Sequence, residues 1–429
     1  MAALSLHAAQ AEPADLLGTR ALRAVEEWRS RVGLDRSHRS GSDEFPFEEV
    51  VAHYRSVGRG GANPALVTEL RDLHGAVQSA APAEEGDRGA PLLAGWLRLT
   101  FDQEGGDYHT YVGTHLYDAM REQAQEDKGD VLSDTIMAAL AVDLLSIEAA
   151  ALAVEPSRGQ RTRVRTAYQL LGSMDALAPS WALEFKGEAS PLAPPNDLVG
   201  DEALAAAVSQ AVSAAADRIP WPVRRLVENT MLPVTRLHDE QMFIRSIQVF
   251  EGLYVHVGRC LERAISALGS GDTEGGCAEL TDAAERLEAV PALFRVLTTM
   301  PREAFAVIRD NTHGRSAVQS TSYRRVEALS APPTPGNPQS PLPGTEGETL
   351  QEVFERQTPW LPRRDVVRFE DTMRRLDAGW HKSKRTHWGI TLKVIGSVPG
   401  TGGTSGADYL KQTAEVPLFP GLAAGTPGA

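Results

Sequence analysis

The chain has 429 residues, of which 42% are hydrophobic, and a formal net charge of −14 at pH 7. This length allows one large domain or two ordinary ones, with a sizeable core. Because phosphate binding needs a basic patch, the acidic balance argues against nucleic acid and anionic membranes as partners.

The first half of the chain is predicted to be helical. Residues 1–13 lack a basic start followed by an apolar stretch, so no secretory signal is expected. Apolar residues recur on one helical face in 14–34, followed by a polar break at 35–43; a loop is expected at 81–90, and the type of 92–101 stays open. Further helices are predicted at 63–80, 131–154 and 159–175, and an alanine-rich one at 201–219. The most apolar of these segments, 136–154, is not expected to cross a membrane, because it contains Asp143, Ser146 and Glu148.

The clearest helix covers residues 239–268. Its apolar side chains recur at alternating steps of four and three residues, which predicts a long seam in an antiparallel bundle. These residues are Phe243, Ile247, Phe250, Tyr254, Val257, Leu261, Ala264 and Leu268. Residues 269–276 turn the chain, and a second long helix follows, in which Pro291 should produce a kink or a split.

The last third of the chain contains a predicted mobile loop between helices. Residues 331–348 hold six prolines, three glycines and no aromatic residue, so they cannot bury enough apolar surface to order themselves. Helices are predicted near 349–357, 364–376 and 382–395. Cys260 and Cys277 are the only cysteines, without a CxxC pair, so we expect reduced thiols in a cytoplasm and no thiolate zinc site. The whole pattern predicts an all-α fold.

A histidine and a glycine-rich loop near the C-terminus could carry chemistry. His387 has Ile390 and Val394 on the same helical face, where a lone histidine is most often a core residue. Its functional interpretation is a neutral imidazole that binds haem iron in an apolar pocket. The loop 400–406 has no Gly-Lys-Ser/Thr and is not a P-loop, but it lets a ligand approach the backbone closely, and Thr401 adds a hydroxyl.

Two other candidate sites are weaker when taken alone. Arg324 offers a fork of donors suited to a carboxylate, although a surface arginine paired with Glu327 is the ordinary interpretation. His109 and His115 could be paired metal ligands, but no carboxylate has suitable spacing, so solvated loop residues are expected. The Asp and Glu that follow His238 suit a helix N-terminus, where negative charge is stabilised without any catalytic role.

Taken together, these segments resemble the tryptophan 2,3-dioxygenase family. The order is HDE-x-x-F from His238, QS-x-x-YR-x-x-E ending at Glu327, then His387, thirteen residues, and T-G-G-x-S-G from Thr401. A short T-Y-x-G string at 110–113 also matches. The resemblance covers less than half of the chain, mainly 238–330 and 376–420, and implies the all-α helical bundle of tryptophan and indoleamine 2,3-dioxygenases.

The resemblance also implies roles for individual residues. His387 would ligate haem b, Arg324 would hold the substrate carboxylate, and Thr401 would contact the substrate ammonium. Phe243 would line the substrate pocket. Tyr111 lies in the segment that in the family packs over a neighbouring subunit's pocket, which implies a homo-oligomer. The family's distal histidine lies four residues after the phenylalanine, and that position is Ile247 here.

The parts of the chain that do not match the family pattern suggest how the domains are organised. Residues 1–100 have no counterpart in the family pattern and are predicted to be an N-terminal helical extension. Residues 101–429 would form the haem dioxygenase-like helical domain. Within it, 121–237 would be a helical insertion between motifs that the family keeps close, and 331–348 would be the proline-rich mobile loop.

The predicted function is a haem-dependent dioxygenase of tryptophan catabolism, which uses dioxygen to cleave the indole ring of tryptophan or a tryptophan derivative. Two alternatives stay open. One is a haem-dependent monooxygenase of an aromatic amino acid in secondary metabolism. The other is a non-catalytic haem carrier or sensor, which would not need an amino-acid clamp, so the presence of both Arg324 and Thr401 favours an enzyme.

Overall fold

The computed structural model of the chain is all-helical wherever it is described. It describes residues 13–32, 44–79, 89–101, 107–123, 129–183, 192, 194, 200–312, 315, 317–333, 342–394, 396 and 405–424. Every regular element in these ranges is an α-helix or a short 3-10 helix, which confirms the predicted fold class.

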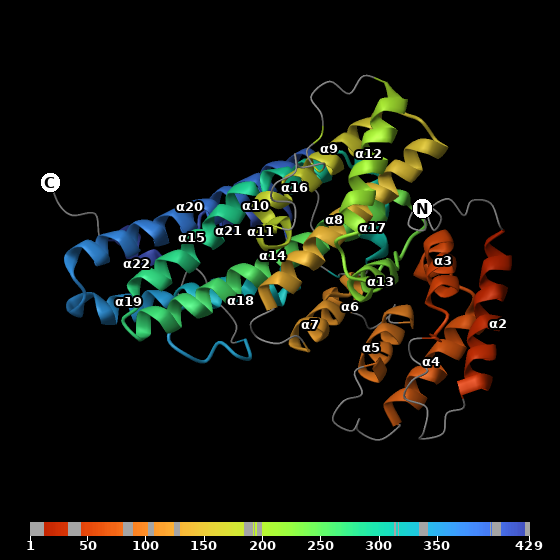
Figure 1. Cartoon of the computed structure of the whole chain (residues 1–429), viewed down its shortest axis with the longest axis horizontal. Helices are drawn as coiled ribbons and strands as arrows, with labels where there is room; N and C mark the ends of the chain where they lie inside the picture. Colours follow the sequence, from red (N-terminus) through yellow and green to blue (C-terminus); the bar gives the residue numbers. More distant parts are fainter. Residues whose placement is uncertain are drawn as a thin grey trace.

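The N-terminal helices form a cluster of their own at one end of the molecule, drawn red to orange in Figure 1. Their hydrophobic centre contains a group of aromatic rings in edge-to-face contact: Trp28, Phe45, Phe47 and Trp96. Such contacts favour a fixed geometry beyond simple area burial. The elements are α2 (Ala14–Val32), α3 (Phe47–Val57), η2 (Arg59–Gly61), α4 (Pro64–Ser79) and α5 (Gly89–Phe101).

This N-terminal cluster is joined to the rest of the chain through η2. The backbone N–H groups of Arg59 and Gly60 donate to the carbonyls of Pro233 and Val234, at 2.8 and 3.1 Å. Gly58 has a φ of 72°, and a Cβ atom there would lie 2.4 Å from the Val234 carbonyl oxygen. Glycine is therefore required where the two backbones meet.

The middle of the chain surrounds one very apolar helix, α8. The elements are α6 (Tyr108–Val112), α7 (Thr114–Glu122), α8 (Gly129–Val154), α9 (Arg158–Gly172), α10 (Met174–Leu177), α11 (Pro179–Ala182), α12 (Asp201–Ala216) and α13 (Trp221–Asn229). Among the described residues, α8 is the one helix long and apolar enough to span a membrane, yet 78% of its apolar stretch is buried inside the protein. It packs against α9, α12, α13 and α14, as a core helix does.

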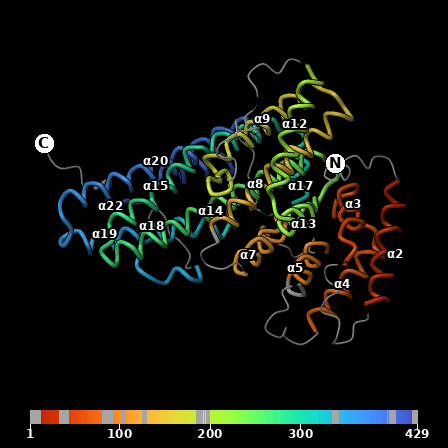
Figure 2. Tube along the Cα trace, viewed as in Figure 1, coloured from red at the N-terminus to blue at the C-terminus, as the bar shows by residue number. Residues whose placement is uncertain are grey.

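Three helices form the long axis of the molecule: α14 (His238–Gly269), α15 (Thr273–Ala289) and α20 (Arg363–Val394). Helix α15 packs against both α14 and α20, and the tube in Figure 2 shows the three running along the body. The remaining elements are α16 (Pro291–Leu297), α17 (Arg302–Asn311), η5 (Ala317–Gln319), α18 (Thr321–Ser330), α19 (Leu350–Gln357), η6 (Thr358–Trp360), α21 (Ala407–Ala414) and α22 (Pro420–Ala424).

The predicted seam of α14 is largely buried. Ile247, Phe250, Val257, Leu261, Ala264 and Leu268 are all 9% exposed or less. Phe243 and Tyr254 are partly buried and pack against the same core. The expected split at Pro291 is also present, because α15 ends at Ala289 and α16 begins at Pro291.

One prediction about the helices was wrong. Residues 364–376 and 382–395 were expected to be two helices, but α20 is continuous from Arg363 to Val394. Gly379 lies in the middle of the expected break. A Cβ atom there would lie 3.3 Å from the Leu287 Cβ atom on α15, so this glycine serves close helix packing and does not end the helix. Of the predicted mobile loop, residues 334–341 lie outside the described residues.

Candidate active site

The first motif segment, at the start of α14, is held in place by a buried carboxylate. Glu240 is fully buried and accepts hydrogen bonds from the backbone N–H groups of Val234 and Thr235, at 2.9 and 2.6 Å. The Tyr111 hydroxyl donates to the same carboxylate at 3.0 Å. Glu240 therefore organises the turn before α14, which is a structural role of the kind expected for this motif.

Three of the sequence-predicted residues lie together beside this carboxylate. Tyr111 and Ile247 belong to one small hydrophobic cluster, and the partly buried Phe243 packs against it. Phe243 also makes an edge-to-face contact with Phe305, with ring centroids 5.8 Å apart. Ile247 is 9% exposed. The position that corresponds to the family's distal histidine thus lies among apolar and tyrosine side chains.

The segment that carries Arg324 is tied to the same region by Glu251. This glutamate on α14 accepts a hydrogen bond from the Tyr108 hydroxyl at 2.6 Å and another from the Ser322 hydroxyl. Burial raises the pKa of Glu251, although the hydrogen bonds from the two hydroxyls act to lower it. His109 is also part of this junction, because its Nε2 atom lies 2.7 Å from the Thr321 hydroxyl oxygen.

Arg324 lies in the first turn of α18 and is half-buried. Ser320 caps this helix, since its hydroxyl oxygen accepts a hydrogen bond from the Tyr323 N–H at 3.1 Å. Burial raises the pKa of Glu327, and the positive charges of Lys384 and, more weakly, Arg324 act to lower it. Arg324 therefore interacts electrostatically with Glu327, but Lys384 lowers the pKa of that carboxylate more strongly.

A group of aromatic rings connects α18 to α20 and α14. Tyr323 stacks on Trp380 with centroids 4.8 Å apart, and Tyr254 contacts both rings at 5.3 and 5.5 Å. A second set of rings leads to the predicted haem ligand. The ring centroid of Phe294 lies 4.7 Å from that of Phe250 and 6.0 Å from that of the His387 imidazole, and Phe294 stacks on this imidazole.

His387 interrupts the buried face of α20. The residues along this face, Leu376, Trp380, Ser383 and Val394, are buried, and Ile390 packs against the core. His387 itself is exposed, although enough protein surrounds it that burial lowers the pKa of its imidazole to about 4. The His387 ring is therefore accessible to a ligand although the fold encloses it.

The His387 imidazole is also chemically available. Within the described part of the chain, neither ring nitrogen makes a hydrogen bond. A depressed pKa means that the ring is neutral at pH 7, which is the form that binds iron. The donor is therefore suited to haem, whereas a satisfied core histidine would carry at least one hydrogen bond.

Some predicted site residues are placed and others are not. Phe243, Tyr111 and Ile247 lie together, Arg324 lies on the neighbouring α18, and His387 lies on α20 beside Phe294. Thr401 falls outside the described residues. Sequence reasoning did not find Glu251 or Trp380. The only signal for Glu251 was a charge next to the apolar seam, and its partners lie 143 and 71 residues away.

Comparison with known proteins relates the chain to enzymes of one name. Tryptophan 2,3-dioxygenase of Anaeromyxobacter sp. (strain K) is 27% identical over 235 residues, which cover 44% of this chain and 87% of that protein. The enzyme of the same name from Bradyrhizobium sp. (strain ORS 278) is 26% identical over 245 residues, covering 44% of this chain and 84% of that protein. No family model matches the chain. The matches span most of each relative at low identity, which supports membership of the tryptophan 2,3-dioxygenase family for this distantly related chain.

Proposed function

We propose that the chain is a haem-dependent dioxygenase that opens the indole ring of tryptophan or a tryptophan derivative, with dioxygen as co-substrate. The observation that carries the proposal is His387, a neutral and accessible imidazole enclosed by the fold beside Phe294. The relatives named above are tryptophan 2,3-dioxygenases, which supports the same reaction class.

The residues present fit a haem group. His387 would hold the iron through a neutral nitrogen, and Phe294 would lie against that imidazole. Burial depresses the pKa of His387, so the imidazole stays neutral well below pH 7 without help from a neighbouring charge. When bound, the haem supplies the oxygen chemistry, and the protein supplies binding, orientation and a dry surrounding.

The substrate would be held by groups on α18 and on the loop that follows α20. Arg324 would bind the carboxylate of the amino acid through paired hydrogen bonds, and Thr401 would contact its ammonium group. Glu251 supports this arrangement indirectly, because Ser322 and Tyr108 bind the same carboxylate and fix the start of α18 against α14. Phe243 and Tyr111 would border the aromatic end of the substrate.

A monooxygenase reaction on an aromatic amino acid is the second candidate, and Ile247 is the observation that favours it. A hydrocarbon side chain cannot accept the indole N–H proton. A positioned base contributes about 10²–10⁴-fold to a rate, so its loss slows a reaction without preventing it. With no base at this position, the pocket should also accept a substrate that lacks the N–H group.

The Soret band of the purified protein is first recorded with and without tryptophan and 1-methyltryptophan. The deciding experiment is then a reaction of each compound under ¹⁸O₂, with the products analysed by mass spectrometry. A ring-opened product with two labelled oxygen atoms would support the dioxygenase. One labelled atom in an intact ring would favour the monooxygenase. Bound haem with no product from any aromatic amino acid would leave a haem carrier or sensor.

The remaining proposals concern the whole chain. We propose a cytoplasmic enzyme and a homo-oligomer, as the family resemblance implies. We also keep the division into an N-terminal helical extension, 1–100, and a catalytic helical domain, 101–429, with an insertion at 121–237. Sedimentation of the purified chain would test the oligomer, and a single sedimenting monomer would contradict it.

A further inference from the structure

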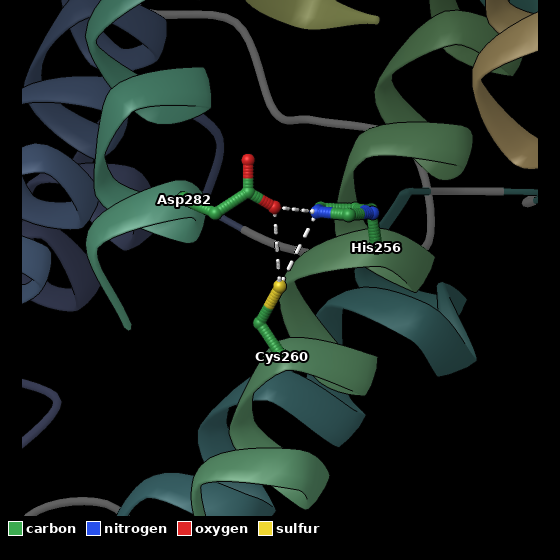
Figure 3. Close-up of side chains that lie close together, drawn as sticks. All are labelled: His256, Cys260 and Asp282. Atoms are coloured by element: carbon green, nitrogen blue, oxygen red, sulfur yellow. Dashed lines mark hydrogen bonds and ion pairs between the residues drawn. The ribbon is translucent and has the colours of Figure 1, made fainter. Parts of the chain in front are cut away.

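A second cluster of reactive side chains lies on α14, beyond the candidate active site. His256 and Cys260 are one helical turn apart, and Asp282 on α15 points toward both of them, as Figure 3 shows. The His256 Nε2 atom lies 2.5 Å from Asp282 Oδ2 and 3.2 Å from Cys260 Sγ, and Sγ lies 3.6 Å from Oδ2. His256 and Cys260 are 1% and 0% exposed.

Hydrogen bonding explains only part of this geometry. The Nε2–H group and the Cys260 thiol can both donate to Asp282 Oδ2, which leaves the approach of Sγ to Nε2 without a hydrogen of its own. The other nitrogen, Nδ1, is buried and makes no hydrogen bond within the described part of the chain. A catalytic relay would instead use both nitrogens, one toward the thiol and one toward the carboxylate.

We propose that His256, Cys260 and Asp282 bind a zinc ion. The three ligand atoms converge on one point, and a thiolate, an imidazole and a carboxylate are the donors that zinc accepts. A soft thiolate disfavours magnesium and calcium. With three protein ligands, the fourth position would hold a water molecule.

The distances need little adjustment. Zinc bond lengths of about 2.3 Å to sulfur and about 2.0–2.2 Å to nitrogen and oxygen, at a tetrahedral angle, separate the ligand atoms by roughly 3.3–3.6 Å. The two edges that include Sγ are already close to that range. The edge between Nε2 and Oδ2 must open by roughly 0.8 Å on the same bond lengths. The Asp282 side chain is 36% exposed, so it can make this movement and admit the ion from solvent.

The surroundings supply an outer partner for the histidine. Asp130 Oδ1 lies 3.9 Å from the orphaned His256 Nδ1. Histidines that bind metals commonly donate the hydrogen of their second nitrogen to a carboxylate, which fixes the ring with its other nitrogen toward the ion. A small rotation of Asp130, which is 38% exposed, would complete this contact.

The charges near the site favour a divalent cation. The carboxylates are Asp130, Asp134, Glu279 and Asp282, and the guanidinium groups that pair with them are Arg259, Arg263 and Arg286. With a Cys260 thiolate the group carries a formal charge of −2, which one zinc ion neutralises. Burial raises the pKa of the Cys260 thiol, so zinc binding would release the thiol proton to solvent.

This site could not be expected from the sequence, which lacks a CxxC pair. His256 and Cys260 are four residues apart, as the helix periodicity allows. Asp282, the third ligand, is 26 residues from His256 and lies on another helix. Zinc bound here would join α14 to α15. The proposal is independent of the haem reaction, and its failure would leave the proposed function unaffected.

The test uses the full-length chain, purified with haem after growth in medium with zinc and dialysed extensively. Metal analysis should find one zinc per chain, with iron as an internal measure of haem. Absorption fine structure at the zinc edge should show one sulfur ligand at about 2.3 Å and lighter ligands at about 2.0–2.1 Å. Cys260→Ala should lose the zinc and keep the iron, whereas Cys277→Ala should keep both.

Asp130→Asn provides a variant that leaves all three ligands in place. Zinc affinity in this variant, measured by competition with a chelator, should fall about 10–100-fold. Three results would each overturn the proposal: wild-type zinc no higher than in Cys260→Ala, equal zinc loss in Cys277→Ala, or a zinc edge spectrum with no sulfur ligand. A Cys260→Ala chain that failed to fold would leave the edge spectrum and Asp130→Asn to decide.

Discussion

The N-terminal cluster, α2–α5, and the larger core around α14, α15 and α20 are both hydrophobic, but they differ in the polar groups that they bury. The N-terminal cluster is built mainly from apolar and aromatic contacts. The larger core encloses ion pairs, such as Arg245 with Asp143 at 2.6 Å and Arg286 with Asp134. It also encloses Glu240 and Glu251.

This difference has a physical meaning. A buried charge costs free energy unless its partners are correctly placed, so each buried pair restricts the geometry around it. Apolar packing is more tolerant of rearrangement. The first motif segment lies beside the buried carboxylates of Glu240 and Glu251, and we infer that this part of the fold needs precise positions. The N-terminal cluster contributes stability and holds the loop before α14.

The largest expected effect is on haem. His387→Ala should remove the ligated haem spectrum, and added imidazole should restore it, because the small ligand can occupy the vacated position. Absorption spectroscopy of the purified protein measures both outcomes. His381→Ala, on the same helix but in an open surface groove, is the control and should keep a normal Soret band. An unchanged spectrum in His387→Ala would remove the main support for a special role of the larger core.

Trp96→Ala should mainly reduce stability. Trp96 is 2% exposed and donates from Nε1 to the Asn229 carbonyl at 2.8 Å. Loss of a buried tryptophan costs about 3–5 kcal/mol in the free energy of unfolding, which denaturant titration measures. Trp221→Ala is the control, since Trp221 is 58% exposed. If Trp96→Ala lost substrate affinity while still folded, the N-terminal cluster would have a direct functional role.

Arg324→Leu should weaken the binding of tryptophan by about 2–4 kcal/mol, because a charge-assisted paired contact with the carboxylate is lost. Haem content should stay normal. Calorimetry with tryptophan and with tryptamine, its carboxylate-free analogue, separates the two explanations. Equal losses for both compounds would mean that Arg324 supports the fold and does not recognise the carboxylate.

Arg59→Met tests the connection between the two regions and should have the smallest effect. Arg59 is 2% exposed and donates to the carbonyls of Leu99 and Tyr111, at 3.1 and 2.8 Å. In this variant both carbonyls lose their donor, which should lower the free energy of unfolding by about 1–3 kcal/mol. The variant should also show a higher KM for the substrate. Arg29→Met, which breaks a partly exposed pair with Glu69, should cost no more than about 1 kcal/mol. A Michaelis constant unaffected by Arg59→Met would separate the two regions functionally.

Long periodic segments made most of the fold predictable. The spacing of apolar residues in α14 is sustained over many turns, so the existence of this helix followed from sequence. Helix α8 is buried on nearly all sides, and its long apolar composition indicated it instead. Helices such as α6 and α18 are too short to display a period. The break expected near Gly379 is absent from α20, and a sequence does not reveal whether such a glycine ends a helix or permits close packing.

The candidate site was predictable only where a motif carried it. Phe243, Arg324 and His387 were predicted to belong to it through motif order and spacing. The contact of Glu251 with Tyr108 and Ser322 joins three distant parts of the chain, and no local pattern indicates such a contact. The stacking of Phe294 on His387 likewise depends on how α16 packs against α20.

The close contact at Gly379 limits how the gene for this chain can change in length. Each residue turns an α-helix by roughly 100°. Gly379 fixes which side of α20 meets Leu287, and His387 follows two turns later on the same rigid rod. Insertion or deletion of a single codon between them would swing the imidazole away from Phe294, even if every other residue were kept. This stretch should therefore tolerate substitutions on its outer side but have a fixed length.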